Sequence, residues 1–282
     1  MGRTESTCYP RWKAHHRSAR PFFFPKPRLS FYRDDTLPKW EERPYDVVFT
    51  GNYTPLSKFE PTIERHGKEY ADFYYGIIED FKKHPHLGMD IGIREHLLSE
   101  VEDITKDGVK EMMPNMIMID LYVRNYFRGK VVQTLVDAGV SVHCFGAGWE
   151  FLPCEHPENL IKEGGVDSLA CLQALSKAKV SLNVMPWFKD GAHDRVFNSM
   201  LNGAVCFTDW SRYLTENLRD GEDIFFYELD ALECLPDMVQ GILENRKKWE
   251  HMQKAAYETA EKSHTWEHRA GAVHKEILSK IR

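Results

Sequence analysis

The chain has 282 residues, of which 42% are hydrophobic and 28% charged. That length is enough to bury a core in one large domain or in two small ones. We expect no membrane span, because no apolar run approaches the ~18 residues that a transmembrane helix needs. We expect no secretory signal, because the apolar stretch 22–24 is too short and lies between prolines. The net charge of −6 argues against a general nucleic-acid-binding protein.

The six cysteines are scattered along the chain and include no CxxC pair, which argues against a zinc site. They are Cys8, Cys144, Cys154, Cys171, Cys206 and Cys234. Several lie in apolar stretches, where a thiol behaves as a small hydrophobic group. This usage fits a reducing, cytoplasmic location and leaves a disulfide open.

The charge is unevenly distributed between the first 40 residues and the rest. Residues 1–40 hold nine Lys or Arg and three Asp or Glu, a net of +6, so the remainder is acidic. We expect 1–44 to form a basic, poorly ordered arm, as termini commonly do, ahead of one domain at 45–282. Contact with anionic lipid, a polyanion or a partner domain is the alternative role for the arm.

Apolar runs that predict buried strands alternate with helical periodicity from Tyr45 onward. The expected strands are 45–50, 140–145, 180–184, 204–208 and 223–227, with a minor one at 160–161. The expected helices are 58–84, 91–104, one from after Pro114 to Ala138, 167–178, 194–202, a short one at 213–214, 231–245, 246–261 and 266–281. This alternation predicts an α/β fold, a Rossmann-like parallel sheet flanked by helices.

Three stretches at the expected strand ends are candidates for ligand contact. Gly51 and Asn52 follow the first strand, and glycines 146 and 148 with Trp149 follow the next; glycine permits a close backbone approach to a ligand. An ordinary turn explains Gly51 and Asn52 equally well, and Trp149 either stacks on a ligand or covers the core. The third stretch is the loop 185–193 with the helix that follows it.

The helix from Asp194 is expected to have one apolar and one polar face. Arg195, Asn198 and Asn202 share the polar face at helical spacing. A helix N-terminus offers free amide donors and a partial positive charge, which suit a phosphate, and a bidentate guanidinium would add to it. The alternative is that Arg195 pairs with Asp190 or Asp194.

A second polar face, on the helix that ends at Ala138, has two interpretations. Asp120, Arg124 and Arg128 recur every four residues along it. They form either a solvated ladder of charges or a basic patch near the phosphates.

The residues of the third stretch resemble a known motif. They are Gly191-Ala192-His193-Asp194-Arg195-Val196-Phe197, then Gly203-Ala204 and Thr208-Asp209. Together with Ser181-Leu182-Asn183, Gly146-Ala147-Gly148-Trp149 and Phe49-Thr50-Gly51-Asn52, they are similar to the donor-binding, C-terminal half of GT-B glycosyltransferases. The particular group they resemble is the CgeB-like "glycosyl transferases group 1" family, and the similarity spans about residue 45 to the end.

The resemblance implies a nucleotide-sugar site, with a nucleotide-diphosphate sugar as donor substrate, no cofactor and no metal. It implies that Gly51 and Asn52 lie by the phosphates and that the loop from Gly146 to Trp149 borders the nucleotide. It also implies that His193 and Arg195 face the diphosphate, where they would stabilise the leaving group. Asn198 would reach a sugar hydroxyl, and Asp190, Gly191 and Asp209 complete the expected binding residues.

Two departures from the family limit what the resemblance implies. Related retaining enzymes place two glutamates where this chain has Asp190 and Asn198. GT-B enzymes also have an N-terminal, acceptor-binding domain, which the residues before the first strand cannot build. We therefore expect a glycosyltransferase donor domain that is a fragment or needs a partner domain or chain. A non-catalytic nucleotide- or sugar-binding module is the alternative, and a nucleotide-sugar epimerase is a third. The missing GxGxxG argues against a dinucleotide oxidoreductase.

Overall fold

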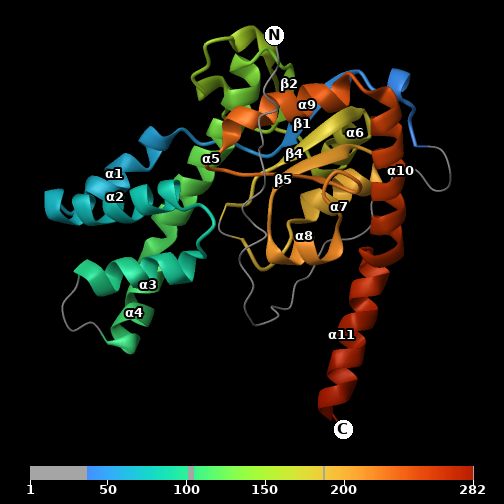
Figure 1. The fold of residues 1–282 in the computed structure, drawn as a ribbon. Helices are drawn as coiled ribbons and strands as arrows, with labels where there is room; N and C mark the ends of the chain where they lie inside the picture. The colour runs from blue at the N-terminus through green and yellow to red at the C-terminus, as the bar shows by residue number, and fades with distance from the viewer. Residues whose placement is uncertain (1–36, 101–104, 187, 282) are drawn as a thin grey trace, which may run out of the picture.

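The computed structural model describes residues 37–100, 105–186 and 188–281. Its centre is one sheet whose strand order is β3-β2-β1-β4-β5-β6, and every pairing between neighbouring strands is parallel. The strands are β1 (Tyr45–Thr50), β2 (Val142–Phe145), β3 (Leu160–Gly164), β4 (Ala178–Asn183), β5 (Val205–Asp209) and β6 (Phe225–Tyr227). A parallel sheet with helices packed on it confirms the predicted α/β, Rossmann-like fold class (Figure 1).

The central strands are apolar because helices cover both faces of the sheet. Val47, Val48 and Phe49 of β1 are all fully buried although neighbouring side chains point to opposite faces. One face packs against α5 (Ile117–Asp137) and α9 (Leu235–Leu243), and the other against α6 (Ser168–Ser176), α7 (Asp194–Leu201) and α8 (Arg212–Asn217). The long helix α10 (Arg246–Ser263) contacts α7, α9 and β5, and α11 (Trp266–Ile281) continues away from the sheet (Figure 1).

The connection from β1 to β2 is a helical subdomain that stands to one side of the sheet (Figure 1). It contains η3 (Leu56–Lys58), α1 (Glu60–Glu64), α2 (Lys68–Lys83), α3 (Met89–Glu100), α4 (Lys106–Met112) and η4 (Met113–Met116), and ends in α5. The single helix predicted over 58–84 is two helices, because Gly67 adopts φ 93° between them. Helix α4 was not predicted from the sequence; its N-terminus is capped by Thr105, whose hydroxyl accepts a hydrogen bond from the Gly108 amide.

Other predicted elements are present with shifted ends. The strand expected at 140 begins at Val142, and the minor strand at 160 extends to Gly164. The helix expected from 231 is preceded by η7 (Leu232–Cys234). The remaining short turns are η2 (Trp40–Glu42), η5 (Trp149–Phe151) and η6 (Pro157–Asn159).

Most of the predicted N-terminal arm lies outside the described residues, and its division from the body at Tyr45 stays a prediction. The last part of that stretch packs on the sheet. Arg43 is buried and donates to the carbonyl oxygens of Ala178 (2.6 Å) and Asn202 (3.2 Å). In the part of the chain that the structure describes, no helix is long and apolar enough to cross a bilayer.

Candidate functional site

A cavity of about 470 Å³ lies at the carboxyl ends of β1 and β2, against α6 and the N-terminal part of α7. The strand order reverses between β1 and β4, and open parallel sheets bind ligands in the crevice at such a point. Its lining residues are Thr50, Gly51, Asn52, Phe145, Gly146, Val166, Ser168, Cys171, Leu172, Leu175, His193, Asp194, Arg195 and Asn198. Six residues predicted from the sequence therefore line one cavity, namely Gly51, Asn52, Gly146, His193, Arg195 and Asn198.

The loops after β1 and β2 are in close backbone contact at the edge of this cavity. The Gly51 amide donates to the Phe145 carbonyl (2.9 Å), and a Cβ on Gly146 would lie 2.2 Å from the Gly51 oxygen. The Asn52 Oδ1 accepts from the Ala147 amide (2.9 Å), so this side chain ties the loops together. Its Nδ2 has no partner within the described part of the chain and can donate to a ligand.

Trp149 supports this loop pair from the core and does not line the cavity. Its side chain is fully buried, its Nε1 donates to the Gly51 carbonyl (2.8 Å), and its ring stacks on Tyr53. Gly148 has φ 91°, and a Cβ there would lie 1.9 Å from the Tyr53 oxygen. The sequence left two roles open for Trp149, and this geometry agrees with the one in which it covers the core. Trp149 and Gly148 affect the cavity only by fixing the loop that contains Gly51.

Arg195 is a buried cation held by a neutral partner. Its side chain lies over the Phe49 ring at 5.3 Å, and its Nη1 donates to the Asn183 Oδ1 (2.7 Å). Burial lowers the pKa of Arg195, and the nearby charge of Asp194 opposes that shift only in part. A guanidinium without a hydrogen-bonded carboxylate is costly to bury unless an anion joins it.

The pairing of Arg195 with Asp190, one alternative left by the sequence, is not observed. Asp190 pairs with Arg212 (2.8 Å), and Asp194 lies 2.7 Å from the His193 Nδ1. Neither carboxylate is hydrogen-bonded to Arg195 in the described structure. The Asp194 side chain nevertheless borders the cavity, and it is the one carboxylate among the lining residues described.

Asn183, at the end of β4, holds Arg195 in position. Its Nδ2 donates to the Thr208 Oγ1 (2.8 Å), and its carbonyl accepts from the Tyr227 hydroxyl (2.7 Å). The bond from Nδ2 turns the side-chain amide oxygen toward the guanidinium, and the Tyr227 bond holds the backbone carbonyl of Asn183. The sequence signal for this role was a polar residue at the carboxyl end of an apolar strand.

Arg128 brings a second guanidinium to the same region from α5. Its Nη1 donates to the Asn52 carbonyl (3.0 Å), and its buried Nε has no partner in the part described. Burial first, and then the charges of Arg195 and Arg124, lower the pKa of Arg128 to about 9. Each of the two interpretations of this polar face therefore applies to part of it. Arg124 forms an ion pair with Asp120 at 2.5 Å, whereas Arg128 is close enough to Arg195 for that charge to lower its pKa.

His193 is the N-cap of α7, and its ring is neutral near pH 7. Its Nδ1 lies 3.1 Å from the Arg195 amide nitrogen and 2.7 Å from the Asp194 Oδ1. The first contact needs a bare Nδ1 and the second a protonated one, so the two contacts correspond to opposite tautomers. Burial first, and then the Arg195 charge, lower the pKa of His193. The remaining nitrogen, Nε2, therefore donates in one tautomer and accepts in the other.

Three of the predicted binding residues hold the β4–α7 loop and do not line the cavity. Asp209 is buried; its Oδ1 accepts from the Met185 amide (2.6 Å) and its Oδ2 from the Lys189 Nζ (2.8 Å). The Gly191 carbonyl accepts from the Ser211 hydroxyl. With the Asp190–Arg212 pair, these contacts fix the loop that carries His193.

The predicted division of α7 into two faces holds with one correction. The apolar face is buried as expected, with Val196, Phe197, Met200 and Leu201 packed on the sheet. Arg195 and Asn198 border the cavity, but Asn202 does not. Asn202 is fully buried at the other end of the helix, where its Nδ2 donates to the Asn198 carbonyl.

The cavity is therefore lined by the Arg195 guanidinium and the N-terminus of α7, with the Asp194 carboxylate at its border and the Arg128 guanidinium beside it on the Asn52 carbonyl. Guanidiniums and a helix N-terminus favour an anion with several oxygens. Within residues 37–100, 105–186 and 188–281, no group of three or more His, Cys, Asp or Glu side chains is placed to hold a metal ion. Open parallel α/β sheets of this kind form a class of proteins that bind their ligands at the switch point. Residues 128–275, more than half of the chain, match the "Glycosyl transferase-like" family, and the chain belongs to that family.

Solved glycosyltransferase structures align with the chain at low similarity. TarM from S. aureus, in a complex that includes UDP, has 13% identity and a TM-score of 0.43, over 52% of this chain and 31% of its own. The pneumococcal O-GlcNAc transferase GtfA, with UDP and GlcNAc, has 12% identity and a TM-score of 0.44, over 88% and 38%. The C-terminal domain of the group 1 family protein LpcC from Francisella tularensis has 13% identity and a TM-score of 0.37, over 86% and 96%.

This chain spans only 31% and 38% of the lengths of TarM and GtfA. No curated protein matches the chain at a significant level.

Proposed function

We propose that the cavity binds the diphosphate of a nucleotide-sugar, so that this chain is the donor-binding part of a glycosyltransferase. The observation that carries the proposal is the buried Arg195 guanidinium, which borders the cavity and has a neutral amide as its hydrogen-bonding partner. A bound diphosphate would add a hydrogen-bonded negative charge beside Arg195, where the Asp194 carboxylate is the one lining carboxylate described. Membership of the family supports the same ligand class.

The chemistry of sugar transfer fits the groups around the cavity. As the glycosidic bond breaks, negative charge grows on the leaving diphosphate, and donors already aimed at it stabilise the transition state more than the ground state. Arg195, Arg128 and the amides at the start of α7 would provide these donors. Two guanidiniums can do this without a metal ion, so the proposed reaction is metal-independent and needs no cofactor.

His193 would contribute a donor or an acceptor at the same phosphates. In the tautomer whose Nδ1 accepts from the Arg195 amide, the Nε2–H donates to a phosphate oxygen. In the other tautomer, Nε2 is a base. The diphosphate charge favours the donor form, and it also favours protonation of the ring.

The finer assignments belong to this proposal. They are the CgeB-like subgroup, a cytoplasmic location, and a partner domain or chain that supplies the acceptor site. One observation favours the alternative of a non-catalytic nucleotide- or sugar-binding module. Asn198 borders the cavity where the resemblance expects a glutamate, and Asp190 is turned away to Arg212. An amide can hydrogen-bond a sugar hydroxyl, but it provides no carboxylate charge.

Isothermal titration with UDP-, GDP-, dTDP- and ADP-glucose tests the proposal. We expect Arg195→Ala to weaken binding of the recognised nucleotide-sugar by ~1.5–3 kcal/mol, as for a lost charge-assisted bond. Arg246→Ala, which removes an exposed guanidinium paired with Glu250, is the matched control and should leave affinity unchanged. No heat of binding with any of the four sugars would refute the proposal. Binding without hydrolysis or transfer would favour the non-catalytic alternative.

A further inference from the structure

His193 and Asp194 are in close contact at the start of α7, on the wall of the cavity at the strand ends. The Asp194 Oδ1 lies 2.7 Å from the His193 Nδ1, and both residues line the cavity. The same Nδ1 lies 3.1 Å from the Arg195 amide nitrogen. Three consecutive residues therefore place a carboxylate and a backbone amide around one ring nitrogen.

The contact with Asp194 determines which ring nitrogen of His193 carries the proton. A bare Nδ1 would place its lone pair 2.7 Å from a carboxylate oxygen, which is repulsive, whereas an Nδ1–H donates a charge-assisted hydrogen bond there. The bond that is then given up, from the Arg195 amide to a bare Nδ1, is longer and joins two neutral groups. Hydrogen bonds to an ionised group are roughly twice as strong as neutral ones. The free chain therefore favours the tautomer with Nδ1 protonated.

The Nε2 of His193 is then the ring nitrogen left for a ligand. It has no hydrogen-bond partner in the part of the chain that the structure describes. A bare Nε2 accepts hydrogen bonds and cannot donate one to a phosphate oxygen, so contact with a phosphate requires a proton from solvent. Once the ring is protonated, the Asp194 carboxylate at Nδ1 balances part of its charge.

The net charge around the cavity leaves room for that proton. Arg195 and Asp194 line the cavity with opposite charges, and Arg128 adds a positive charge beside it. These three groups together carry one positive charge, whereas the diphosphate of a nucleotide-sugar carries two negative charges. A proton on His193 would make the occupied site neutral, and a partly buried site favours a neutral total.

The other charged and titratable groups near His193 do not compete for this proton. Burial first, and then the Arg195 charge, lower the pKa of His193 in the free chain, and Asp194 acts in the opposite direction. Arg128 of α5 also lowers this pKa. From α6, Cys171 is the one titratable lining residue described, and its thiol is uncharged near pH 7 because burial raises its pKa. An anion in the cavity would reverse the balance at His193.

We infer that Asp194 is a positioning residue that holds His193 with Nδ1 protonated, so that an anionic donor binds together with a proton at Nε2. The donor rests on the proposed function of the cavity, whereas the tautomer and its response to an anion follow from the contact between the two side chains. Asp194 has a second effect of opposite sign. At alkaline pH, where the ring stays neutral, its carboxylate repels the diphosphate. The pair therefore makes donor binding favourable in acid and unfavourable in base.

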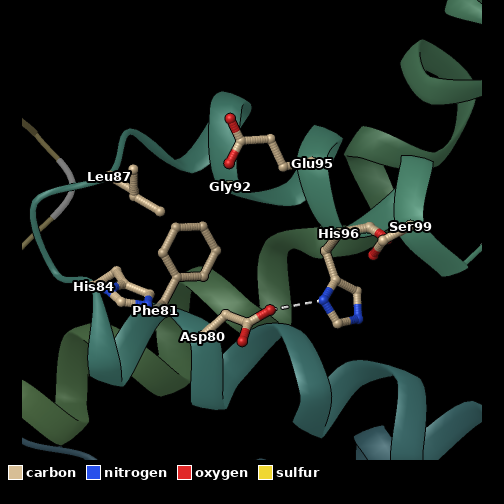
Figure 2. A pocket seen from close by; sticks show the side chains of 8 residues that line it. All are labelled: Asp80, Phe81, His84, Leu87, Gly92, Glu95, His96 and Ser99. Carbon is tan, nitrogen blue, oxygen red and sulfur yellow. Dashed lines mark hydrogen bonds and ion pairs between the residues drawn. The ribbon is translucent and has the colours of Figure 1, made fainter.

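A second histidine–aspartate pair in the same chain provides the control. Figure 2 shows the His96 Nδ1 facing the Asp80 Oδ2, at 2.8 Å, between α3 and α2. The small cavity beside this pair has no Lys or Arg among its described lining residues. An anion finds no positive charge there, so this pair reports effects of pH and salt that do not depend on the donor site.

Heteronuclear NMR of the imidazole nitrogens in the full chain tests the tautomer, with His193→Gln to assign the signals. We expect the free chain at pH 8 to have Nδ1 protonated and Nε2 bare. Asp194→Asn should shift the population to the Nε2–H tautomer, because an amide can donate to a bare Nδ1. Sodium sulfate, whose divalent anion does not titrate in this range, should raise the pKa of His193 relative to sodium chloride at equal ionic strength. The His96 signals should not respond to sulfate, and Asp80→Asn should leave the His193 response unchanged.

Isothermal titration with the recognised nucleotide-sugar tests the consequence for binding. Wild-type affinity should be about threefold or more higher at pH 6 than at pH 8. In Asp194→Asn this ratio should approach one, and the affinity at pH 8 should exceed that of the wild type because a repulsive carboxylate is gone. An acidic residue at a helix N-terminus also stabilises the helix. A purely structural role would lower the melting temperature of Asp194→Asn and leave the ratio unchanged.

The outcomes separate this inference from the donor proposal. A free chain with the His193 proton on Nε2, a His193 pKa that sulfate leaves unchanged, or a wild-type pH ratio in Asp194→Asn would each overturn the inference. If a nucleotide-sugar binds equally well at pH 6 and pH 8, the inference fails and the donor proposal stands. If sulfate raises the pKa of His193 but no nucleotide-sugar binds, the donor proposal fails and the role of Asp194 at an anion site stands.

Discussion

At the scale of single residues, two guanidiniums meet one carboxylate at the cavity on the strand ends: Arg195 and Asp194 line it, and Arg128 lies beside it. Burial first, and then the charge of Arg195, lower the pKa of Arg128; Arg195 is buried and Arg128 is partly buried. Each buried charge costs free energy in the unliganded chain. A diphosphate that contacts both side chains would remove this cost, which is why these two residues should contribute more to ligand affinity than to the stability of the free protein.

His193 should take up a proton when a nucleotide-sugar binds. Burial first, and then the Arg195 charge, lower its pKa in the free chain, so the neutral ring predominates at pH 7. A diphosphate beside it raises that pKa, so affinity should increase as the pH falls from 7.5 to 6. The diphosphate of a nucleotide-sugar is a diester and does not itself titrate in this range. Isothermal titration at pH 6 in two buffers with different ionisation enthalpies measures the proton uptake.

His193→Gln is the control for this experiment, because glutamine keeps a hydrogen-bonding group but does not titrate. Proton uptake should vanish in this variant, and the pH dependence of affinity should flatten. Undiminished uptake in His193→Gln would assign the proton to another group and contradict the proposed contact.

At the scale of elements, the β4–α7 loop is positioned by a buried ion pair. The Asp209 carboxylate accepts hydrogen bonds from the Lys189 Nζ and from the Met185 amide. The Asp209 side chain is 1% exposed and the Lys189 side chain 11%. Asp209→Asn leaves the lysine charge unpaired, which should cost ~3–5 kcal/mol of unfolding free energy and weaken nucleotide-sugar binding through the misplaced loop. Asp190→Asn, in a more exposed pair, should cost less than ~1 kcal/mol. Urea unfolding compares the two, and equal losses would contradict this role for Asp209.

The turn after β2 depends on Gly148 for two separable reasons. In Gly148→Ala the new Cβ is placed on a residue with positive φ and clashes with the Tyr53 oxygen. In Gly164→Ala the residue also has a positive φ, 79°, but no atom lies within 4 Å of the new Cβ. In Gly165→Ala there is neither a positive φ nor a neighbouring atom within 4 Å of the new Cβ. Thermal unfolding should rank the losses in that order, with at least ~1–3 kcal/mol for strain at a positive φ and more at Gly148. Equal melting temperatures for Gly148→Ala and Gly164→Ala would show that the loops after β1 and β2 can move apart without a loss of stability.

The elements that could be predicted are those whose local pattern agrees with their packing. The unit from β4 to β5 has apolar runs, an amphipathic α7 and Gly203 at φ 75° after the helix, so its sequence is sufficient. The break at Gly67 could not be predicted in this way, because the apolar spacing continues on both sides of it. The burial of Trp149 was also undecided, since a tryptophan after a strand packs inward or outward according to what lies opposite, here Tyr53 and Phe49.

At the scale of the whole molecule, the site combines segments that are distant in sequence. Asn52, Arg128, Ala147 and Arg195 are brought together by the strand order and by the helical subdomain, which places α5 beside the loop after β1. Periodicity showed that Arg128 lies on a polar face of its helix, but not that this face meets Asn52. Long-range contacts of this kind depend on topology, which local pattern does not encode.

Hydrogen exchange measured by mass spectrometry tests this assembly in one experiment. Binding of a nucleotide-sugar to these segments links them, and their opening then requires loss of the ligand. We expect slower exchange at saturating ligand in residues 50–53, 145–148 and 193–198, and also in 124–130, because Arg128 contacts the same anion. Helix α11, which extends away from the sheet and has no buried residue, should exchange at the same rate with and without ligand. Protection of the first three segments without 124–130 would remove α5 from the site, and protection spread equally over α11 would indicate a general change in stability with no local site.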